Sequence, residues 1–566
     1  MRELLSGARQ RADFAVWKAR TVSRVAVQTG MHASIRWPGA RRLVGELARG
    51  RFGPSTLFRF QADNDPHRAA IVDPREMLGA RADRLYSYRE FNDLIDRLGL
   101  ALHHWGIGPG RSALVMLKNR PEFLILQPAI SRIGGAAVSV SWRSTVPELA
   151  YLARHSGAGV LFFDTELRSL IEEAAPELTG IPRERMIAVG GAAPGFPTLE
   201  EVAAEAGIAP DLSESGAVVM YTSGTTGKPK GAVRTFPRDA IAGTLAFIGE
   251  TSMRVGDVHL AVCPLYHATA FGFVGMSFLL GGTIVVLPEF RPELFLEAIQ
   301  RYRVASTAVV PTMLHRLLEL GEARIRAYDT SSLRAIFSGG APLPAQLASD
   351  VMNVLGDKLY NFYGATETGL VTIATPADLR ASPGTIGRAI PGVDIRLLDD
   401  AGRPLGEDEV GELYASSALL IEGYHKDPEA TRLSMQSGYF SVGDLARRDA
   451  RGCYFIEGRK RDMIISGGVN VYPAEVEAAL HEHPAVAEAA VVGVPDREWG
   501  ERVRAFVVRR PGAAATEEDI KAHCKSRLAR PKVPRDVVFL EELPRNPTGK
   551  VLKRELARME IEVEVI

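Results

Sequence analysis

The chain has 566 residues, more than a single hydrophobic core usually holds, so several domains are expected. Apolar residues make up 46% of it and charged residues 24%, an ordinary composition for a soluble globular enzyme. Basic and acidic residues both number 68, so no net positive field favours nucleic acid as a partner. The cysteines Cys263, Cys453 and Cys524 are far apart and match no metal-ligand spacing. They favour a reducing, cytoplasmic location over a disulfide framework.

The first 55 residues differ from the rest in charge, since they hold eleven Lys or Arg and three acidic residues. They lack the unbroken apolar core of a signal peptide. Several large apolar side chains stand among the arginines: Phe14, Trp17, Val22, Val25 and Trp37. Two alternatives follow for this segment. It lies as a basic amphipathic helix on an anionic membrane surface, peripherally on the inner face, or it packs across the large domain or the second subunit of a homodimer.

The next segments alternate between helical and strand patterns. Residues 86–105 carry leucine and isoleucine at three- and four-residue steps, which predicts a helix, and residues 122–133 are again helical in pattern. Apolar runs at 112–117 and 135–140 predict a strand after each helix. Alternation of this kind continues to about residue 380 and predicts parallel sheets covered by helices. Ligands bind such sheets at the carboxyl ends of the strands.

Residues 221–231 read Tyr-Thr-Ser-Gly-Thr-Thr-Gly-Lys-Pro-Lys-Gly and follow a strand-like run at 217–220. Glycines let backbone N–H groups approach an anion closely, and the hydroxyls and lysines add donors and positive charge. The segment therefore predicts a phosphate cradle at the end of a strand. It is not the common P-loop, because two residues separate Gly224 from Gly227 and Pro229 follows Lys228.

Residues 268–287 carry no charge over a length that formally suffices for a membrane-spanning helix. Gly281 and Gly282 interrupt the segment, and residues 283–287 resemble a strand. We therefore expect a buried helix, a Gly-Gly turn and a core strand.

After residue 384 the pattern changes to short alternating strands separated by glycine turns, and after Gly458 to a compact α+β unit. The expected strands are 395–398, 412–414, 453–456, 486–494 and 505–508, with a helix at 473–481.

Six further motifs follow the cradle in order: Ser338-Gly-Gly-Ala-Pro-Leu343, Asn361-Phe-Tyr-Gly-Ala-Thr-Glu367, Gly411-Glu-Leu413, Gly438-Tyr-Phe-Ser-Val-Gly-Asp444, Gly458-Arg-Lys-Arg-Asp-Met-Ile-Ile-Ser-Gly467 and Pro544-Arg-Asn-Pro-Thr-Gly-Lys550. Together they resemble the adenylate-forming superfamily, in particular acyl-CoA synthetases such as long-chain fatty acid–CoA ligases. The resemblance implies an α/β fold in which a large domain of parallel-type sheets with a small β-barrel (56–460) follows the basic segment (1–55). A mobile α+β lid domain (461–566) then completes the chain.

The resemblance also implies ATP, Mg²⁺ and CoA as cofactors and co-substrates. It assigns ATP binding to Thr222, Ser223, Gly224, Thr225, Thr226, Lys230, Gly340, Ala341, Asn361, Phe362, Tyr363, Thr366, Asp444, Arg459 and Lys550. Glu367 resembles the magnesium ligand, with help from Thr225, since hard cations prefer carboxylate oxygen. Lys550, Thr366 and Arg459 are the expected catalytic groups, because a carboxylate must attack an anionic α-phosphate and both charges need neutralising.

Domain rotation between two half-reactions is implied at Arg461, where aspartate or lysine is usual. It would bring Ser466, Gly467 and Gly468 to the site for CoA. Val442 also departs from the family pattern, which often has threonine there.

The acyl pocket is expected around His267, Phe271 and Gly339. No acidic residue in these motifs pairs with an amino-acid ammonium, so a fatty acid of medium to long chain is favoured. Three alternatives stay open: a ligase for aryl or short-chain acids, an acyl-AMP ligase that loads a carrier protein, and a non-catalytic lipid-binding scaffold.

Overall fold

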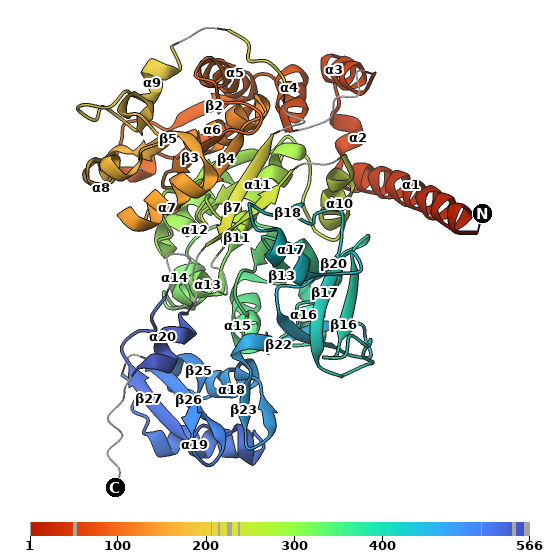
Figure 1. Ribbon diagram of the computed structural model, residues 1–566, viewed down its shortest axis with the longest axis vertical. Coiled ribbons are helices and arrows are strands. Elements are labelled where there is room, and N and C mark those ends of the chain that lie inside the picture. The colour runs from red at the N-terminus through yellow and green to blue at the C-terminus, as the bar shows by residue number, and fades with distance from the viewer. Residues whose placement is uncertain are drawn as a thin grey trace.

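The computed structural model describes residues 2–48, 54–204, 207–212, 216–222, 229–235, 238–510, 512–545 and 551–559. Two large sheets covered by helices form the upper part of the molecule in Figure 1. An antiparallel sheet lies beside their lower end, and a C-terminal α+β unit lies at the bottom. The predicted α/β fold class, with parallel sheets in a large N-terminal part and a smaller C-terminal domain, is confirmed.

The first large sheet has seven strands in the order β18-β8-β7-β4-β3-β5-β6. Its members are β3 (Ser112–Met116), β4 (Ala136–Ser139), β5 (Ala158–Asp164), β6 (Met186–Val189), β7 (Ala217–Thr222), β8 (Lys230–Arg234) and β18 (Gly423–Tyr424). The five strands from β7 to β6 are parallel, whereas β8 and β18 add an antiparallel edge. The glycine-rich segment therefore follows β7 at the carboxyl end of the parallel strands.

The second large sheet has nine strands in the order β15-β14-β13-β12-β11-β9-β10-β1-β2. They are β1 (Ala69–Asp73), β2 (Arg84–Ser87), β9 (Val258–Ala261), β10 (Thr283–Val286), β11 (Ser306–Val309), β12 (Ala335–Ser338), β13 (Leu359–Ala365), β14 (Gly369–Ala374) and β15 (Arg388–Ala389). Strands β1 to β13 in this order run parallel, and the strands at both edges run antiparallel.

Helices cover both sheets, as the alternating pattern predicted. In the part up to residue 434 they are α4 (Pro54–Asn64), α5 (Tyr88–His104), α6 (Pro121–Arg132), α7 (Val146–Ser156), α8 (Arg168–Ala174), α9 (Leu199–Val202), α10 (Arg238–Gly249), α11 (Ala268–Leu279), α12 (Pro292–Tyr302), α13 (Pro311–Leu318), α14 (Glu322–Ile325), α15 (Ala345–Leu355), α16 (Pro376–Ala381) and α17 (Pro428–Ser434). The helix expected from residue 86 begins at Tyr88 because Ser87 caps it: the Ser87 hydroxyl accepts from the N–H of Glu90. The uncharged segment 268–287 forms a helix, a turn and a strand, as expected.

The third sheet has six antiparallel strands and lies where the small β-barrel was expected. They are β16 (Asp394–Leu398), β17 (Gly411–Ser416), β19 (Met435–Gln436), β20 (Tyr439–Phe440), β21 (Asp444–Arg448) and β22 (Tyr454–Arg459). Residues 384–387 join it to the nine-stranded sheet. The Thr385 hydroxyl and the N–H of Ile386 both donate to the carbonyl of Tyr454, while the Thr372 hydroxyl donates to the carbonyl of Ile386.

The C-terminal unit is a five-stranded sheet with helices on it. It contains β23 (Ile464–Ser466), β24 (Val469–Val471), β25 (Val486–Asp496), β26 (Gly500–Arg509), β27 (Asp536–Leu540), α18 (Pro473–His481), α19 (Glu517–Lys525) and α20 (Lys553–Arg558). Its own buried cluster includes Val476 on α18, Ala505 on β26 and Ile520 on α19, so this unit has a core separate from those of the large sheets.

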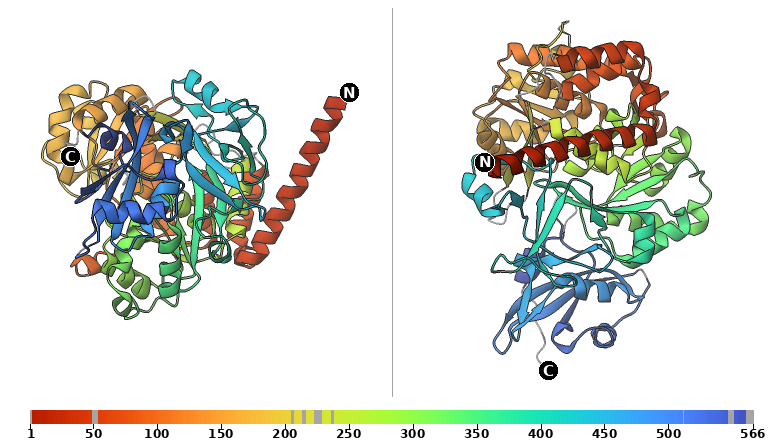
Figure 2. Two further views of the ribbon diagram at one scale, coloured as in Figure 1. Left: turned by 90° about the horizontal axis from the view of Figure 1, so that it is seen from below. Right: turned by 90° about the vertical axis from the view of Figure 1, so that its right-hand side faces the viewer.

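The N-terminal segment forms α1 (Arg2–Thr29), α2 (Met31–Ser34) and α3 (Trp37–Ala48). One end of α1 projects from the body of the molecule (Figure 2). Within the described residues, no helix combines the length and the apolar character that crossing a bilayer requires. All three cysteines are buried and unpaired by disulfides, in agreement with a packing role.

Replacing Gly387 tests the junction between the two sheets. Gly387 has φ +85°, and an added Cβ would lie 2.0 Å from the carbonyl oxygen of Ile373. Gly384 has φ +82° but nothing within 4 Å of an added Cβ. We expect Gly384→Ala to cost about 1 kcal/mol of stability through the left-handed backbone alone. Gly387→Ala should cost about 4 kcal/mol or more, because backbone must move. Urea unfolding of both variants measures this, and equal losses would contradict the junction.

Candidate active site

A single cleft of about 3580 Å³ runs between the sheets and reaches the C-terminal unit. It brings together most of the residues predicted from the motifs: Lys230, His267, Phe271, Gly340, Ala341, Asn361, Phe362, Tyr363, Thr366, Glu367, Asp444, Arg459 and Arg461. Ser223, Gly224, Thr225, Thr226 and Lys550 lie outside the described residues. Thr222 is described only as the backbone end of β7.

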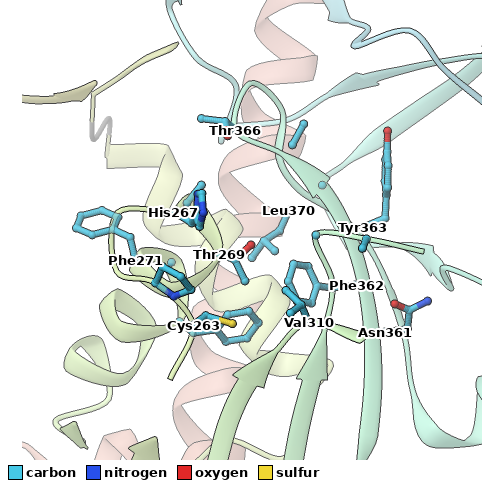
Figure 3. A pocket seen from close by; sticks show the side chains of 18 of the residues that line it. Cys263, His267, Thr269, Phe271, Val310, Asn361, Phe362, Tyr363, Thr366 and Leu370 are labelled. Carbon is cyan, nitrogen blue, oxygen red and sulfur yellow. The ribbon is translucent and has the colours of Figure 1, made fainter. Parts of the chain in front are cut away.

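Strand β13 separates two sides of this cleft, because side chains alternate along a strand. Figure 3 shows Phe362 pointing toward Thr269 and Leu370, whereas Asn361 and Tyr363 lie on the other side of β13. Phe362 was expected among the nucleotide-binding residues, but its ring packs edge-on against Phe273 at 5.2 Å. The period of the strand could have predicted this division.

Gly339 lies directly against the ring of Phe362. A Cβ at this position would lie 2.4 Å from Cζ of Phe362, so only glycine leaves room for that ring. The next residue, Gly340, has φ +76° and continues the turn after β12. On the other side, the Asn361 amide donates to the carbonyl of Thr385 at 2.9 Å, which ties β13 to the junction loop.

Asp444 connects the side of β13 that carries Asn361 and Tyr363 to the antiparallel sheet. It stands opposite Arg459 in the β21–β22 pair. The Tyr363 hydroxyl donates to Oδ2 of Asp444 at 2.7 Å, and Arg459 Nε donates to Oδ1 at 3.1 Å. Burial, reinforced by Asp444, raises the pKa of Tyr363, so the phenol stays a donor. Each carboxylate oxygen has a further lone pair with which to accept a ligand hydroxyl.

Glu367 lies in the turn between β13 and β14 and is 7% exposed. The Tyr424 hydroxyl donates to its Oε1 at 3.0 Å. The Arg234 guanidinium donates to the carbonyls of Thr366 at 2.7 Å and Leu419 at 2.6 Å. Burial lowers the pKa of Arg234 to about 10, with Glu367 acting in the opposite direction. The Thr366–Glu367 turn is therefore held in place by one guanidinium and one phenol.

The residues that flank the glycine-rich loop are also anchored. His155 Nδ1 lies 2.8 Å from the Tyr221 hydroxyl, and the Tyr151 hydroxyl donates to the carbonyl of Pro229 at 3.2 Å. The N–H of His425 donates to the carbonyl of Gly231 at 2.7 Å. Burial, with help from His425, lowers the pKa of His155. The neutral imidazole can therefore accept a hydrogen bond from the Tyr221 hydroxyl.

Lys230 points into this region as well. Its Nζ lies 4.0 Å from the carboxylate of Asp427 and 5.2 Å from the centre of the Tyr424 ring. Sequence reasoning missed Arg234, Tyr424 and the residues around His155. Arg234 had one local signal, since it lies four residues after Lys230 on the same strand and thus on the same face. Tyr424 comes from a distant strand and had none.

The opposite side of β13 is bordered by the start of α11. His267 precedes this helix, and the N–H of Phe271 donates to the His267 carbonyl at 3.2 Å. Apart from His267, the side chains labelled around it in Figure 3 are uncharged at neutral pH: Cys263, Thr269, Phe271, Val310, Phe362 and Leu370. This side suits the uncharged body of a ligand.

The residues expected to contact CoA lie elsewhere in the described structure. Ser466 ends β23, and Gly467 and Gly468 form the turn to β24; none of the three lines the cleft. The N–H of Gly467 donates to the carbonyl of Trp499 at 2.8 Å. Arg461, the expected hinge, does line the cleft, and burial together with Arg459 lowers its pKa.

Comparison with known proteins places this geometry in a family. The profile of the AMP-binding enzyme family matches residues 58–425, and that of the AMP-binding enzyme C-terminal domain matches residues 475–550. The chain therefore belongs to the AMP-binding enzyme family, as the motif resemblance indicated.

Its relatives include several acid–CoA ligases. It is 34% identical to feruloyl-CoA synthase of an Amycolatopsis species over 497 residues, which cover 87% of this chain and 98% of the relative. It is 32% identical to long-chain-fatty-acid–CoA ligase FadD13 of Mycobacterium tuberculosis over 498 residues, 88% of this chain and 96% of the relative. The ATP-bound structure of MatB from Rhodopseudomonas palustris is 30% identical, with a TM-score of 0.79, and covers 89% of this chain and 98% of that one.

Removing the hydroxyl of Tyr363 tests the Asp444 network. Tyr363→Phe takes away a charge-assisted hydrogen bond, so we expect kcat/KM for ATP to fall about tenfold. Asp444→Asn, which leaves Arg459 without its anionic partner, should have a larger effect. Tyr439→Phe is the matched control, since its hydroxyl also donates to an aspartate, Asp394, outside the cleft. Steady-state kinetics with varied ATP measures the three variants, and an equal loss in the control would contradict the assignment.

Proposed function

We propose that the protein is an ATP-dependent acid–CoA ligase. One observation carries the proposal: a single cleft offers a buried carboxylate network on one side of β13 and an uncharged wall on the other. In the first step a carboxylate oxygen of the acid attacks the α-phosphorus of ATP, and the bond to pyrophosphate breaks. In the second step the CoA sulfur attacks the acyl carbon, and the bond to AMP breaks.

The proposed roles follow the charges that these steps create. Asp444 accepts the ribose hydroxyls, and Tyr363 and Arg459 keep its carboxylate oriented. Thr366 donates to the α-phosphate. Lys550 is proposed as the cation between the acid and the α-phosphate, on the strength of its motif. The turn that holds Thr366 is itself held by Arg234, which would help to position the Thr366 hydroxyl for this contact.

Glu367 fits a magnesium ion. Mg²⁺ usually binds one or two protein carboxylates together with substrate phosphates. The described residues contain no group of three or more His, Cys, Asp or Glu that would hold a metal by themselves. Glu367 offers a buried carboxylate whose Oε1 is oriented by Tyr424. We propose that Glu367, with Thr225 from the loop, holds Mg²⁺, which would neutralise phosphate charge when bound.

The acid is proposed to be a fatty acid of medium to long chain. The uncharged wall around Phe271 and Phe362 supports an apolar acyl group, and the likeness to FadD13 supports the same class. The likeness to feruloyl-CoA synthase favours aryl acids as the second candidate. An aromatic ring and an alkyl chain both suit aromatic and aliphatic walls, so the choice between the two candidates needs a direct comparison of alkyl and aryl acids.

An acid panel tests the proposed substrate class. We expect pyrophosphate release to be fastest with fatty acids of medium or long chain and AMP release to require CoA. The measurement follows both products across alkyl and aryl acids, with and without CoA. Fastest release with ferulate or another aryl acid would select the second candidate. AMP release that is indifferent to CoA would contradict CoA ligation and point to a carrier protein, and no release with any acid would point to a scaffold.

Replacing Lys550 separates the two steps. Lys550→Ala should lower the rate of adenylation by a factor of about 1,000, because the cation between the two anions is lost. Thiolysis of added acyl-adenylate should be largely retained, since the lysine is proposed to act only in the first step. Single-turnover assays of each half-reaction measure this. Lys525→Ala, at an exposed lysine on α19, serves as the control; equal loss of both half-reactions in Lys550→Ala would remove the proposed role.

A further inference from the structure

The N-terminal segment has an inner face that packs on the body of the protein. Thr21, Val25 and Thr29 are buried at four-residue steps along α1, and Val25 belongs to the same buried cluster as α10. This bears out the packing alternative for one face of α1. Helices repeat every 3.6 residues, so burial at this spacing leaves the opposite face of α1 outside.

Polar contacts fasten the segment at several places. Arg24 pairs with Glu250 at 3.3 Å, and Gln28 donates to the carbonyl of Gly249 at 3.0 Å. Further along, Arg42 pairs with Asp63 at 2.7 Å. Residues 21–42 are thus docked on the body of the protein, which fixes the direction of their outer faces.

The outer faces of α1 and α3 expose residues at the same spacing. On α1, Val16, Arg20, Ser23 and Val27 are exposed at steps of four, three and four residues, which places them on one face. On α3, the exposed residues Trp37, Arg41, Val44 and Ala48 repeat those steps. The large apolar side chains are strongly exposed: Val16 49%, Val27 67%, Trp37 78% and Val44 66%. Each face combines apolar side chains with an arginine.

Both helices lie on the side of the molecule that faces the viewer in the right-hand panel of Figure 2. The segment is also the basic part of the chain, with eleven Lys or Arg against three acidic residues in the first 55, while the whole chain is neutral. Among the described side chains, Arg20 and Arg41 lie on the same helix faces as exposed apolar groups. The family profile begins only at residue 58, so this surface is an addition to the family fold.

We propose that the outer faces of α1 and α3 dock the protein onto an anionic lipid bilayer. Valines and a tryptophan would enter the interfacial region, where an amphipathic indole is favoured. Arg20 and Arg41 would stay at the level of the lipid phosphates, each contributing through attraction to the negative surface potential. In this arrangement the helices would lie in the membrane surface, and no helix of the described residues is long and apolar enough to cross a bilayer.

A second copy of the chain fits this surface less well. A two-fold dimer through α1 and α3 would bring two basic segments together, and like charges repel. An anionic bilayer supplies the opposite charge and an apolar layer to the same face.

Membrane docking would also affect how the acid reaches the cleft; this inference rests on the proposed function. Val22, Met31 and Ile35 of the segment line the same cleft as His267 and Phe271. Docking would therefore bring the edge of the cleft that these residues line close to the bilayer. A membrane-dissolved fatty acid would be presented near the site that activates it.

Vesicle co-sedimentation of the full-length protein tests the proposal. We expect binding to vesicles of equal parts phosphatidylcholine and phosphatidylglycerol, weak binding to phosphatidylcholine alone, and loss of binding in high salt. The double variant Trp37→Ser/Val44→Ser should bind about tenfold less tightly, and Arg20→Gln/Arg41→Gln should lose at least tenfold. All four positions are exposed, so folding should be unaffected. Ile208→Ser, at another exposed apolar residue (77%), is the matched control.

Vesicle binding is measured without acid, ATP or CoA, so its result does not depend on whether the proposed reaction is correct. Equal binding to neutral and anionic vesicles, or variants that bind like the unchanged protein, would overturn the docking surface. Sedimentation velocity without lipid tests whether a second copy of the chain occupies this surface. A dimer of the unchanged protein that becomes a monomer in Trp37→Ser/Val44→Ser would overturn the proposal in favour of dimerisation. Pyrophosphate release with a short, water-soluble acid should be the same in all variants.

Discussion

The buried carboxylate of Asp444 is the point at which the sheets of this protein meet its candidate active site. A buried charge is tolerated only where donors surround it, and here the donors come from two separate sheets, as Tyr363 and Arg459. The requirement to satisfy one carboxylate therefore couples the position of β13 to that of β21 and β22. Residues 384–387 reinforce this coupling through the backbone, because their hydrogen bonds join the same two sheets.

Phenols recur as the groups that orient the site. Tyr363 donates to Asp444, Tyr424 donates to Glu367, and Tyr221 pairs with His155 beside the glycine-rich loop. Burial raises the pKa of all three tyrosines, so each keeps its proton in the physiological range. A neutral donor can hold a carboxylate in place without cancelling its charge. The proposed roles of Asp444 and Glu367, towards ribose hydroxyls and a metal ion, depend on carboxylates held in this way.

The N-terminal helices, which precede the part of the chain matched by the family profile, have two faces of different character. The inner face of α1 follows the rule of a packed helix, since Thr21, Val25 and Thr29 are buried at four-residue steps. The outer faces of the helices keep large apolar groups in water, which is unfavourable unless another surface covers them. The two alternatives drawn from the sequence, packing and membrane contact, concern opposite faces of the same helices and are therefore compatible.

Much of the fold and part of the site follow from the sequence, because strand and helix periods and glycine-rich turns are local properties. They predicted the alternation around 112–140 and the helix at 473–481, and the motif resemblance identified the segments that carry Glu367 and Asp444. They did not reveal Arg234 or Tyr424 as supports of the Thr366–Glu367 turn, since those contacts join residues more than fifty positions apart. The period of β13 separates Phe362 from Asn361 and Tyr363, but tertiary structure alone decided which side of the strand is uncharged and that α1 buries Val25. The chain encodes which chemical groups are present and their local order, but long-range packing determines which of them share a cleft.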